Sequence, residues 1–155
     1  MTDKNYDEFL ETTGASRNLV EDINHFLLDS NCKREIKTAK SGFTVSYLFR
    51  DTKRTLATFV CRKTGIKIRI LPQHLNEYMG FLETLPAKMK KEIAKASVCK
   101  RLVNPNDCNP KCVMGYDFIM DKERYQKCRY MAFMPSITEE STPYIKRFLQ
   151  NELLQ

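Results

Sequence analysis

The spacing of apolar residues changes from helical to alternating within the first fifty positions. Residues 17–29 carry apolar side chains three and four positions apart, at Leu19, Val20, Ile23, Phe26 and Leu27. This spacing predicts a helix, with Ser16 as its N-cap. The stretch EIKTAK and then GFTVSYLFR follow with a period of two, which predicts a strand with one buried face. That face would consist of Phe43, Val45, Tyr47 and Phe49, with Thr44, Ser46 and Leu48 on the other.

Two more alternating segments follow this strand. The polar run RDTKR precedes TLATFVC, and RKTG precedes IKIRI. In the last segment three isoleucines alternate with Lys67 and Arg69. Short polar connections between segments of period two predict an antiparallel meander.

Helical spacing returns after Pro72. The apolar positions of this stretch are Leu75, Tyr78, Met79 and Leu82. Pro86 stands where a helix favours its first residue, directly before AKMKKEIAKA. We therefore expect two short helices between Pro72 and the cysteine-rich region.

The last third of the chain predicts a hairpin and a closing helix. GYDFIM, the turn DKER and RYQKCRYMAF have the pattern of two strands. A helix is expected to begin near Pro143, with Thr142 as its cap. Its inward face would carry Ile145, Phe148 and Leu149.

This order of elements predicts an α+β fold. Strands joined by tight turns, with helices grouped outside them, indicate an antiparallel sheet, made of the meander and the C-terminal hairpin and covered by helices on one side. The chain has 155 residues, of which 42% are hydrophobic, so it is long enough to bury one core. We expect residues 1–155 to form a single α+β domain.

Charge and hydropathy limit the environment and the partners. No window approaches the 18 or more apolar residues of a membrane span, and the N-terminus has no apolar leader, so a cytoplasmic protein without membrane contact is expected. The formal net charge of +7 makes nucleic acid or an acidic protein a plausible partner. A charge of this size also serves solubility alone.

Six cysteines in a reducing compartment favour thiols or metal ligands over disulfides. Cys108 and Cys112 are a close pair in the stretch CNPKC, and their spacing lies within the range of zinc sites. Cys99 and Cys128 are the candidates that complete a tetrahedral four-cysteine zinc site, with Cys128 in the middle of the second hairpin. Cys32 and Cys61 are expected to be inert.

Two other interpretations of these cysteines stay open. Two or three of the thiols can act together in a functional arrangement, or all can be ordinary buried cysteines. His25 and His74 are expected to be neither ligands nor acid–base groups. No catalytic triad, glycine-rich phosphate loop or HExxH motif occurs, so the sequence favours a protein that is not an enzyme.

Basic residues fall on the polar side of both predicted hairpins. Lys67 and Arg69 belong to the meander, while Lys127 and Arg129 flank Cys128 and share a face with Tyr125. We expect the four cations to be exposed and to form one continuous positive surface. Cations beside an aromatic ring are suited to phosphate contact and base stacking, which makes these five residues a candidate nucleic-acid interface. The alternative is a solvated sheet face whose lysines prevent edge pairing.

The first two thirds of the chain resemble a known family. YDEFL, IKTAKSGFTVSYLFR, FVCRKTGIKIRI and HLNEYMGFLETLPAKMKKEI are similar in order to the YdhG-like small bacterial α+β domains, over about residues 6 to 100. The resemblance implies a frataxin-like shape and, for some members, a role as iron chaperones for iron–sulfur assembly. Iron sites of that kind need an acidic helix face. This chain departs from the pattern because most of it is basic, and its cysteines suggest a cysteine-bearing subgroup.

The sequence thus predicts a bacterial, cytoplasmic, non-enzymatic binding domain. Zinc is the expected cofactor, as a structural ion in the C-terminal third. The alternatives are an iron chaperone, with iron as the bound metal, and a nucleic-acid-binding module that uses a basic sheet face.

Overall fold

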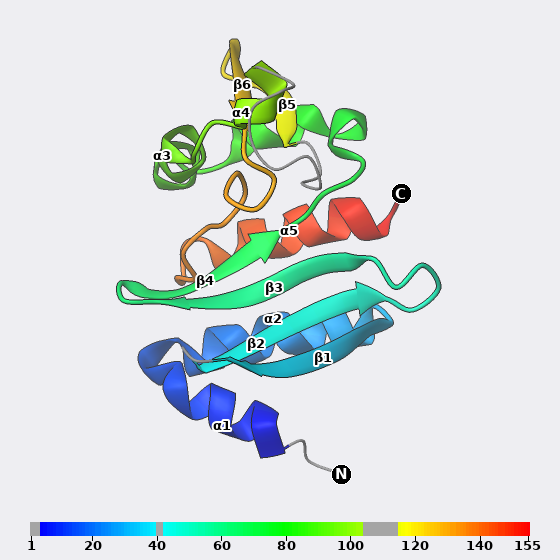
Figure 1. The fold of residues 1–155 in the computed structure, drawn as a ribbon, viewed down its shortest axis with the longest axis vertical. Coiled ribbons are helices and arrows are strands. Elements are labelled where there is room, and N and C mark those ends of the chain that lie inside the picture. The colour runs from blue at the N-terminus through cyan, green and yellow to red at the C-terminus, as the bar shows by residue number, and fades with distance from the viewer. Residues whose placement is uncertain (1–3, 40–41, 104–114) are drawn as a thin grey trace.

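The fold is α+β, and its central element is a four-stranded antiparallel meander (Figure 1). The structure, a computed structural model, describes residues 4–39, 42–103 and 115–155. The N-terminal part consists of α1 (Lys4–Thr12), the 3-10 turn η1 (Gly14–Ser16) and α2 (Arg17–Asp29). The predicted helix at residues 17–29 is therefore confirmed. Ser16 occupies its N-cap but makes no side-chain capping hydrogen bond, since its backbone is helical rather than extended.

The meander has four strands, one more than predicted, because the stretch expected to form one strand forms two antiparallel strands. Its strands are β1 (Cys32–Ala39), β2 (Gly42–Phe49), β3 (Thr55–Arg62) and β4 (Gly65–Ile70), in the order β1-β2-β3-β4. The residues of the helix-covered face include Val45, Tyr47, Phe59 and Ile68, which are at most 1% exposed. The registers place Val45 opposite Phe59 and Phe59 opposite Ile68. One face of the sheet is therefore buried from β2 through β4.

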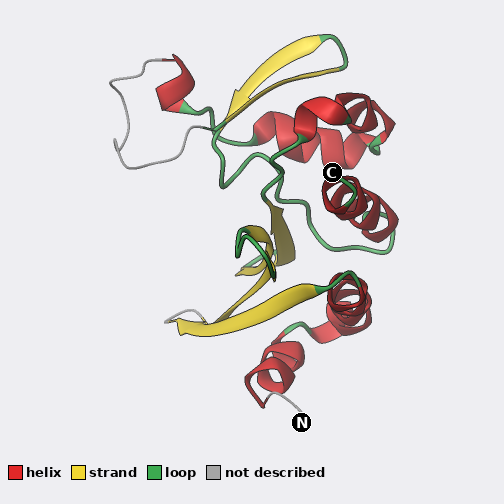
Figure 2. Cartoon of the chain, turned by 90° about the vertical axis from the view of Figure 1, so that its right-hand side faces the viewer, coloured by secondary structure: helices red, strands yellow, loops and turns green. Residues whose placement is uncertain are grey.

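Among the described residues, helices pack against one face of the meander (Figure 2). Asn24 of α2 accepts hydrogen bonds from Tyr47, at 2.6 Å, and from Arg34, at 2.9 Å. The ring of Phe9 in α1 packs against Phe59 of β3, with 5.7 Å between the centroids. The closing helix α5 (Thr142–Leu153) buries Ile145, Phe148 and Leu149, as predicted. The opposite face of the strands looks toward the viewer in Figure 1.

The region after Pro72 differs from the two helices that we expected. It contains two 3-10 segments, η2 (Leu75–Glu77) and η3 (Met79–Thr84), before the α-helix α3 (Ala87–Lys95). Gly80 lies inside the second segment, and glycine weakens an α-helix interior. Pro86 is extended, with ψ at 153°, and so precedes the helix instead of opening it.

The C-terminal hairpin is shorter than predicted. After α4 (Lys100–Val103), β5 (Tyr116–Met120) pairs with β6 (Glu123–Lys127) in a separate two-stranded sheet. Asp121 and Lys122 both have positive φ, as a two-residue turn of type I′ requires. Cys128 therefore follows the strand and does not lie within it. Thr142 is the first residue of α5 and not its cap, a position that Ser141 holds.

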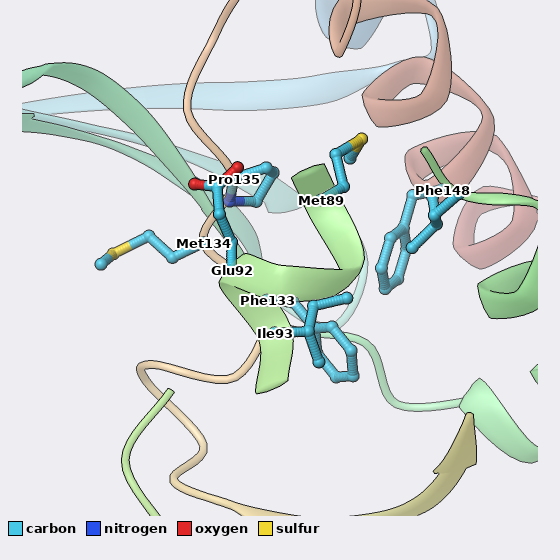
Figure 3. Close-up of a pocket in the computed structure, with 8 residues that line it drawn as sticks. Met89, Glu92, Ile93, Phe133, Met134, Pro135 and Phe148 are labelled. Atoms are coloured by element: carbon cyan, nitrogen blue, oxygen red, sulfur yellow. The ribbon is translucent and has the colours of Figure 1, made fainter. Parts of the chain in front are cut away.

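Residues 133–137 extend the edge of the meander. The amides of Ile68 and Ile70 donate to the carbonyls of Pro135 and Phe133, at 3.1 and 2.8 Å. A cavity of about 10 Å³ lies beside this segment, between α3 and Phe148 (Figure 3). Such a volume holds at most about one water molecule, so it is a packing gap and not a ligand site.

We predict that Ile68→Ala lowers the free energy of unfolding by about 2 to 5 kcal/mol, since it leaves a cavity at a fully buried position. The matched control is Leu154→Ala, because Leu154 is 74% exposed and should change stability by less than about 0.5 kcal/mol. Urea unfolding of both variants measures the difference. Equal losses would contradict the assignment of the buried face.

Candidate functional site

Cys99 and Cys128 lie on neighbouring chain segments at the foot of the C-terminal hairpin. The amide of Cys99 donates to the carbonyl of Gln126, at 2.9 Å, and the amide of Cys128 donates to the carbonyl of Ser97, at 2.7 Å. An antiparallel bridge between Val98 and Lys127 lies between these two hydrogen bonds. Residues 97–99 therefore run antiparallel beside the end of β6, joined to it by an isolated β-bridge.

This register places the two cysteines diagonally across from one another. Val98 opposes Lys127, so Cys99 opposes Gln126 and Cys128 opposes Ser97, all on the other face. Diagonal positions of this kind have Cα atoms about 7 to 8 Å apart, with the Cβ atoms somewhat closer. Two thiolates at such positions can reach one metal ion, because zinc–sulfur bonds are about 2.3 Å long.

The other two predicted ligands, Cys108 and Cys112, lie outside the described residues. Within residues 4–39, 42–103 and 115–155, no group of three or more His, Cys, Asp or Glu side chains is arranged to hold a metal ion. The four cysteines in these ranges are free thiols. Cys32 is buried in the core, where burial raises the pKa of its thiol, and Cys61 is exposed.

Gly115 directly precedes β5 and lies in close contact with Cys99. Its amide donates to the Cys99 sulfur, at 3.3 Å. A methyl group at Gly115 would lie 2.8 Å from Cys99 Cβ and would collide with the Lys127 carbonyl oxygen. A side chain at position 115 would therefore force Cys99 and the Lys127 carbonyl to shift, so glycine is needed here.

The predicted basic residues do not form the exposed surface that we expected. Lys127 is only 8% exposed, and its Nζ donates to the carbonyls of Ala94 and Ala96, at 2.8 and 3.0 Å. These oxygens are at the C-terminal end of α3, where a cation is favourable. The prediction of four exposed cations is therefore wrong: Lys127 is buried at the end of α3, and Lys67, Arg69 and Arg129 are half-buried.

The remaining predicted interface residues have separate surroundings. Lys67 forms an ion pair with Glu92, at 3.3 Å, and the Arg129 guanidinium lies over the Tyr116 ring. Tyr125 stacks on Phe118, and its hydroxyl donates to Glu123. Arg69 donates from Nε to the carbonyl of Tyr130, at 2.8 Å. Of these five residues, only Lys67 and Arg69 belong to the helix-free face of the meander.

Sequence reasoning missed a buried carboxylate at the end of α5. The side chain of Glu152 is fully buried, yet it accepts hydrogen bonds from the His74 amide, at 2.8 Å, and from the Tyr78 hydroxyl, at 2.5 Å. Arg54 forms an ion pair with it at 3.5 Å, and His74 Nδ1 lies 3.4 Å away. A single glutamate late in an amphipathic helix carries no sequence signal for this role.

The surroundings of Glu152 keep it ionised. Burial raises the pKa of its carboxyl, but the hydrogen bonds from Tyr78 and from the amides of His74 and Gln73 outweigh this effect, so its pKa is lowered. Burial and the bond to Glu152 in turn raise the pKa of Tyr78, which stays a hydrogen-bond donor. An open hollow of about 280 Å³, lined by Arg54 and His74 among others, lies beside this carboxylate.

Comparison with known proteins gives no relative. No protein-family model, no curated protein and no solved structure matches this chain. None of the helices in the described part of the chain has the length and apolar character needed to cross a membrane.

We predict that Gly115→Ala destabilises the protein by about 1 to 3 kcal/mol, since overpacking at a tight contact forces the backbone apart. Gly80→Ala is the matched control, because a methyl group there meets no atom within 4 Å. Thermal unfolding compares the two variants. An equal response to both would show that the contact between Gly115 and Lys127 is not required.

We predict that Glu152→Gln costs about 2 kcal/mol at neutral pH, because Arg54 loses its charged partner while the amide oxygen still accepts hydrogen bonds. The folded pKa of Glu152 is lowered, so its stabilisation is present above the unfolded pKa of about 4.3 and is lost as pH falls through the folded value. Urea titrations between pH 7 and pH 3 measure this. A gap between wild type and variant that does not narrow below about pH 4 would contradict the assignment.

Proposed function

We propose that this protein is a cytoplasmic, non-enzymatic binding domain whose C-terminal third is held together by one structural zinc ion. The ligands are Cys99, Cys108, Cys112 and Cys128. The observation that carries the proposal is the pair of hydrogen bonds that join residues 97–99 to the end of β6. They bring together two cysteines that are 29 positions apart (128 − 99) in the sequence.

The chemistry of this region supports a metal. Cys108 and Cys112 are taken from the sequence alone, where they lie between Cys99 and Gly115. The segment around them is rich in Asn, Asp and Pro and has little apolar surface with which to order itself. Thiolate ligands select zinc or iron–sulfur clusters, and a closed set of four is typical of structural sites.

The hydrogen bonds and ion pairs of the buried Glu152 carboxylate favour a binding function over catalysis. Both oxygens of Glu152 already contact hydrogen-bond donors or cations from three different residues, Arg54, His74 and Tyr78. A carboxylate satisfied in this way stabilises the fold, whereas a general acid or base must exchange its proton with a substrate. The iron-chaperone alternative, which follows from the YdhG-like resemblance, stays a prediction.

A second candidate function is nucleic-acid binding on the helix-free face of the meander. The placement of Tyr130 supports it: this residue is 42% exposed, and the Arg69 guanidinium lies 5.8 Å from its ring centroid. An exposed ring beside a cation is suited to a stacked base and its phosphate. Tyr130 thus takes the aromatic role that the sequence suggested for Tyr125.

We predict that the purified protein contains one zinc ion per chain, by elemental analysis. Cys108→Ser should release this ion, and the amides of Cys99 and Cys128 should then exchange hydrogen faster, because metal binding orders the region of its own ligands. The meander amides should keep their protection.

Cys61→Ser is the matched control, since Cys61 is an exposed thiol outside the proposed ligand set. It should leave the zinc content unchanged. Wild-type protein without bound metal after expression in zinc-supplemented medium, or equal zinc loss in both variants, would refute the zinc site.

A further inference from the structure

A small hollow lies on the helix-free face of the meander, between β2, β3 and β4. Its volume is about 120 Å³, and its polar lining comes from Thr44, Thr58, Arg62 and Arg69. Pockets for drug-sized ligands are about 300 Å³ or larger, so this hollow is of a size for one chemical group of a ligand.

Within the described residues, the two arginines in the hollow have no carboxylate partner. The Arg69 guanidinium donates from Nε to the Tyr130 carbonyl, and the described residues offer no acceptor for its other nitrogens. In the same ranges the Arg62 guanidinium has neither a hydrogen bond nor an ion pair. None of the described residues that line the hollow is acidic. As far as the described residues go, two arginine side chains without a neutralising partner therefore line one hollow.

The guanidinium of Arg62 affects the pKa of Arg69. Burial lowers the pKa of this side chain, and the positive charge of Arg62 lowers it further, while Cys128 and Tyr130 raise it. Repulsion between these like charges in a half-buried place destabilises the protein when no ligand is bound. An anion between them would remove that cost.

Acidic residues nearby already form ion pairs with lysines. On the same face of the meander, Glu35 of β1 pairs with Lys33, at 3.8 Å. Glu92 of α3 pairs with Lys67, at 3.3 Å. Neither carboxylate forms an ion pair with Arg62 or Arg69.

Thr44 and Thr58 supply hydroxyl groups to the lining of the hollow, and Thr58 lies next to Arg69. The strand registers place Ser46 opposite Thr58 and Thr58 opposite Arg69, in one row across three strands. Ser46 Oγ and Thr58 Oγ1 are 2.9 Å apart, so one donates to the other and the second hydrogen stays available. Guanidinium forks with nearby hydroxyl donors match the tetrahedral oxygens of a phosphate group.

We propose that Arg62 and Arg69 bind a phosphate group of single-stranded nucleic acid in this hollow, with an adjacent base stacked on the exposed ring of Tyr130. The inference deepens the second candidate function and rests on it, because it names the group that is recognised and the residues that hold it. It does not depend on the zinc site.

The test compares two probes on the full chain. A short fluorescein-labelled oligouridylate reports binding by fluorescence anisotropy at about 50 mM and about 200 mM salt, the range in which phosphate contacts lose affinity. Inorganic phosphate, followed by isothermal titration calorimetry, reports the anion alone. Arg62→Gln is the main variant, since Arg62 is exposed and its loss removes no hydrogen bond or ion pair within the described residues. Arg147→Gln is the control. Arg147 is exposed on α5, on the opposite side of the sheet, and its substitution makes the same change of charge.

We expect Arg62→Gln to weaken oligouridylate binding about tenfold and to lower the slope of log K against log salt by about 0.7, the loss of one phosphate contact with a single strand. Arg147→Gln should leave both unchanged. Tyr130→Ala keeps the carbonyl that orients Arg69, so it should weaken oligouridylate binding and spare the binding of inorganic phosphate.

Each other outcome has a distinct meaning. Oligouridylate binding that is equally strong in wild type and Arg62→Gln overturns the phosphate site but leaves nucleic-acid binding in place. Binding of inorganic phosphate that depends on Arg62, without oligouridylate binding, overturns the nucleic-acid ligand and leaves only a site for a small anion. Binding of neither probe overturns both. Circular dichroism of each variant shows whether the fold is retained.

Discussion

The Glu152 carboxylate joins three parts of the chain that are far apart in sequence. It lies in the last turn of α5, Arg54 reaches it from the connection between β2 and β3, and His74 and Tyr78 reach it from the segment after β4. An ionised group in an apolar core is tolerated only when its charge and lone pairs are satisfied. The position of α5 against the sheet and the path of residues 73–78 are therefore determined together, by one carboxylate.

The residues that support α5 also decide where the C-terminal hairpin lies. Phe148 packs against Phe133 and Phe81, with ring centroids 5.3 and 5.6 Å apart, so the helix contacts both the edge segment of the meander and η3. Phe133 in turn contacts Phe118 of β5, at 5.1 Å. A chain of aromatic contacts thus runs from α5 to the hairpin, and the buried Tyr116 hydroxyl has no partner among the described residues at the end of it.

Periodicity predicted the parts of the fold that depend on local sequence. Val45 was assigned to a buried face because its segment alternates, and its register opposite the buried Phe59 confirms this assignment. Lys127 was misassigned because its burial depends on the carbonyls that end α3, 31 and 33 residues away. Glu152 was missed for the same reason. A polar side chain whose partners are distant in sequence carries no periodic signal, so only the tertiary structure shows its role.

The two proposed sites share the segment that follows β6. At the start of this segment, the amide of Cys128 donates to the Ser97 carbonyl. At its end, the carbonyl of Tyr130 accepts a hydrogen bond from Arg69 Nε. A zinc ion on Cys128 would fix the start of the segment, and with it the ring of Tyr130. Zinc would then strengthen the binding of a nucleic acid to Arg69 and Tyr130. By thermodynamic linkage, the nucleic acid would strengthen zinc binding by the same factor.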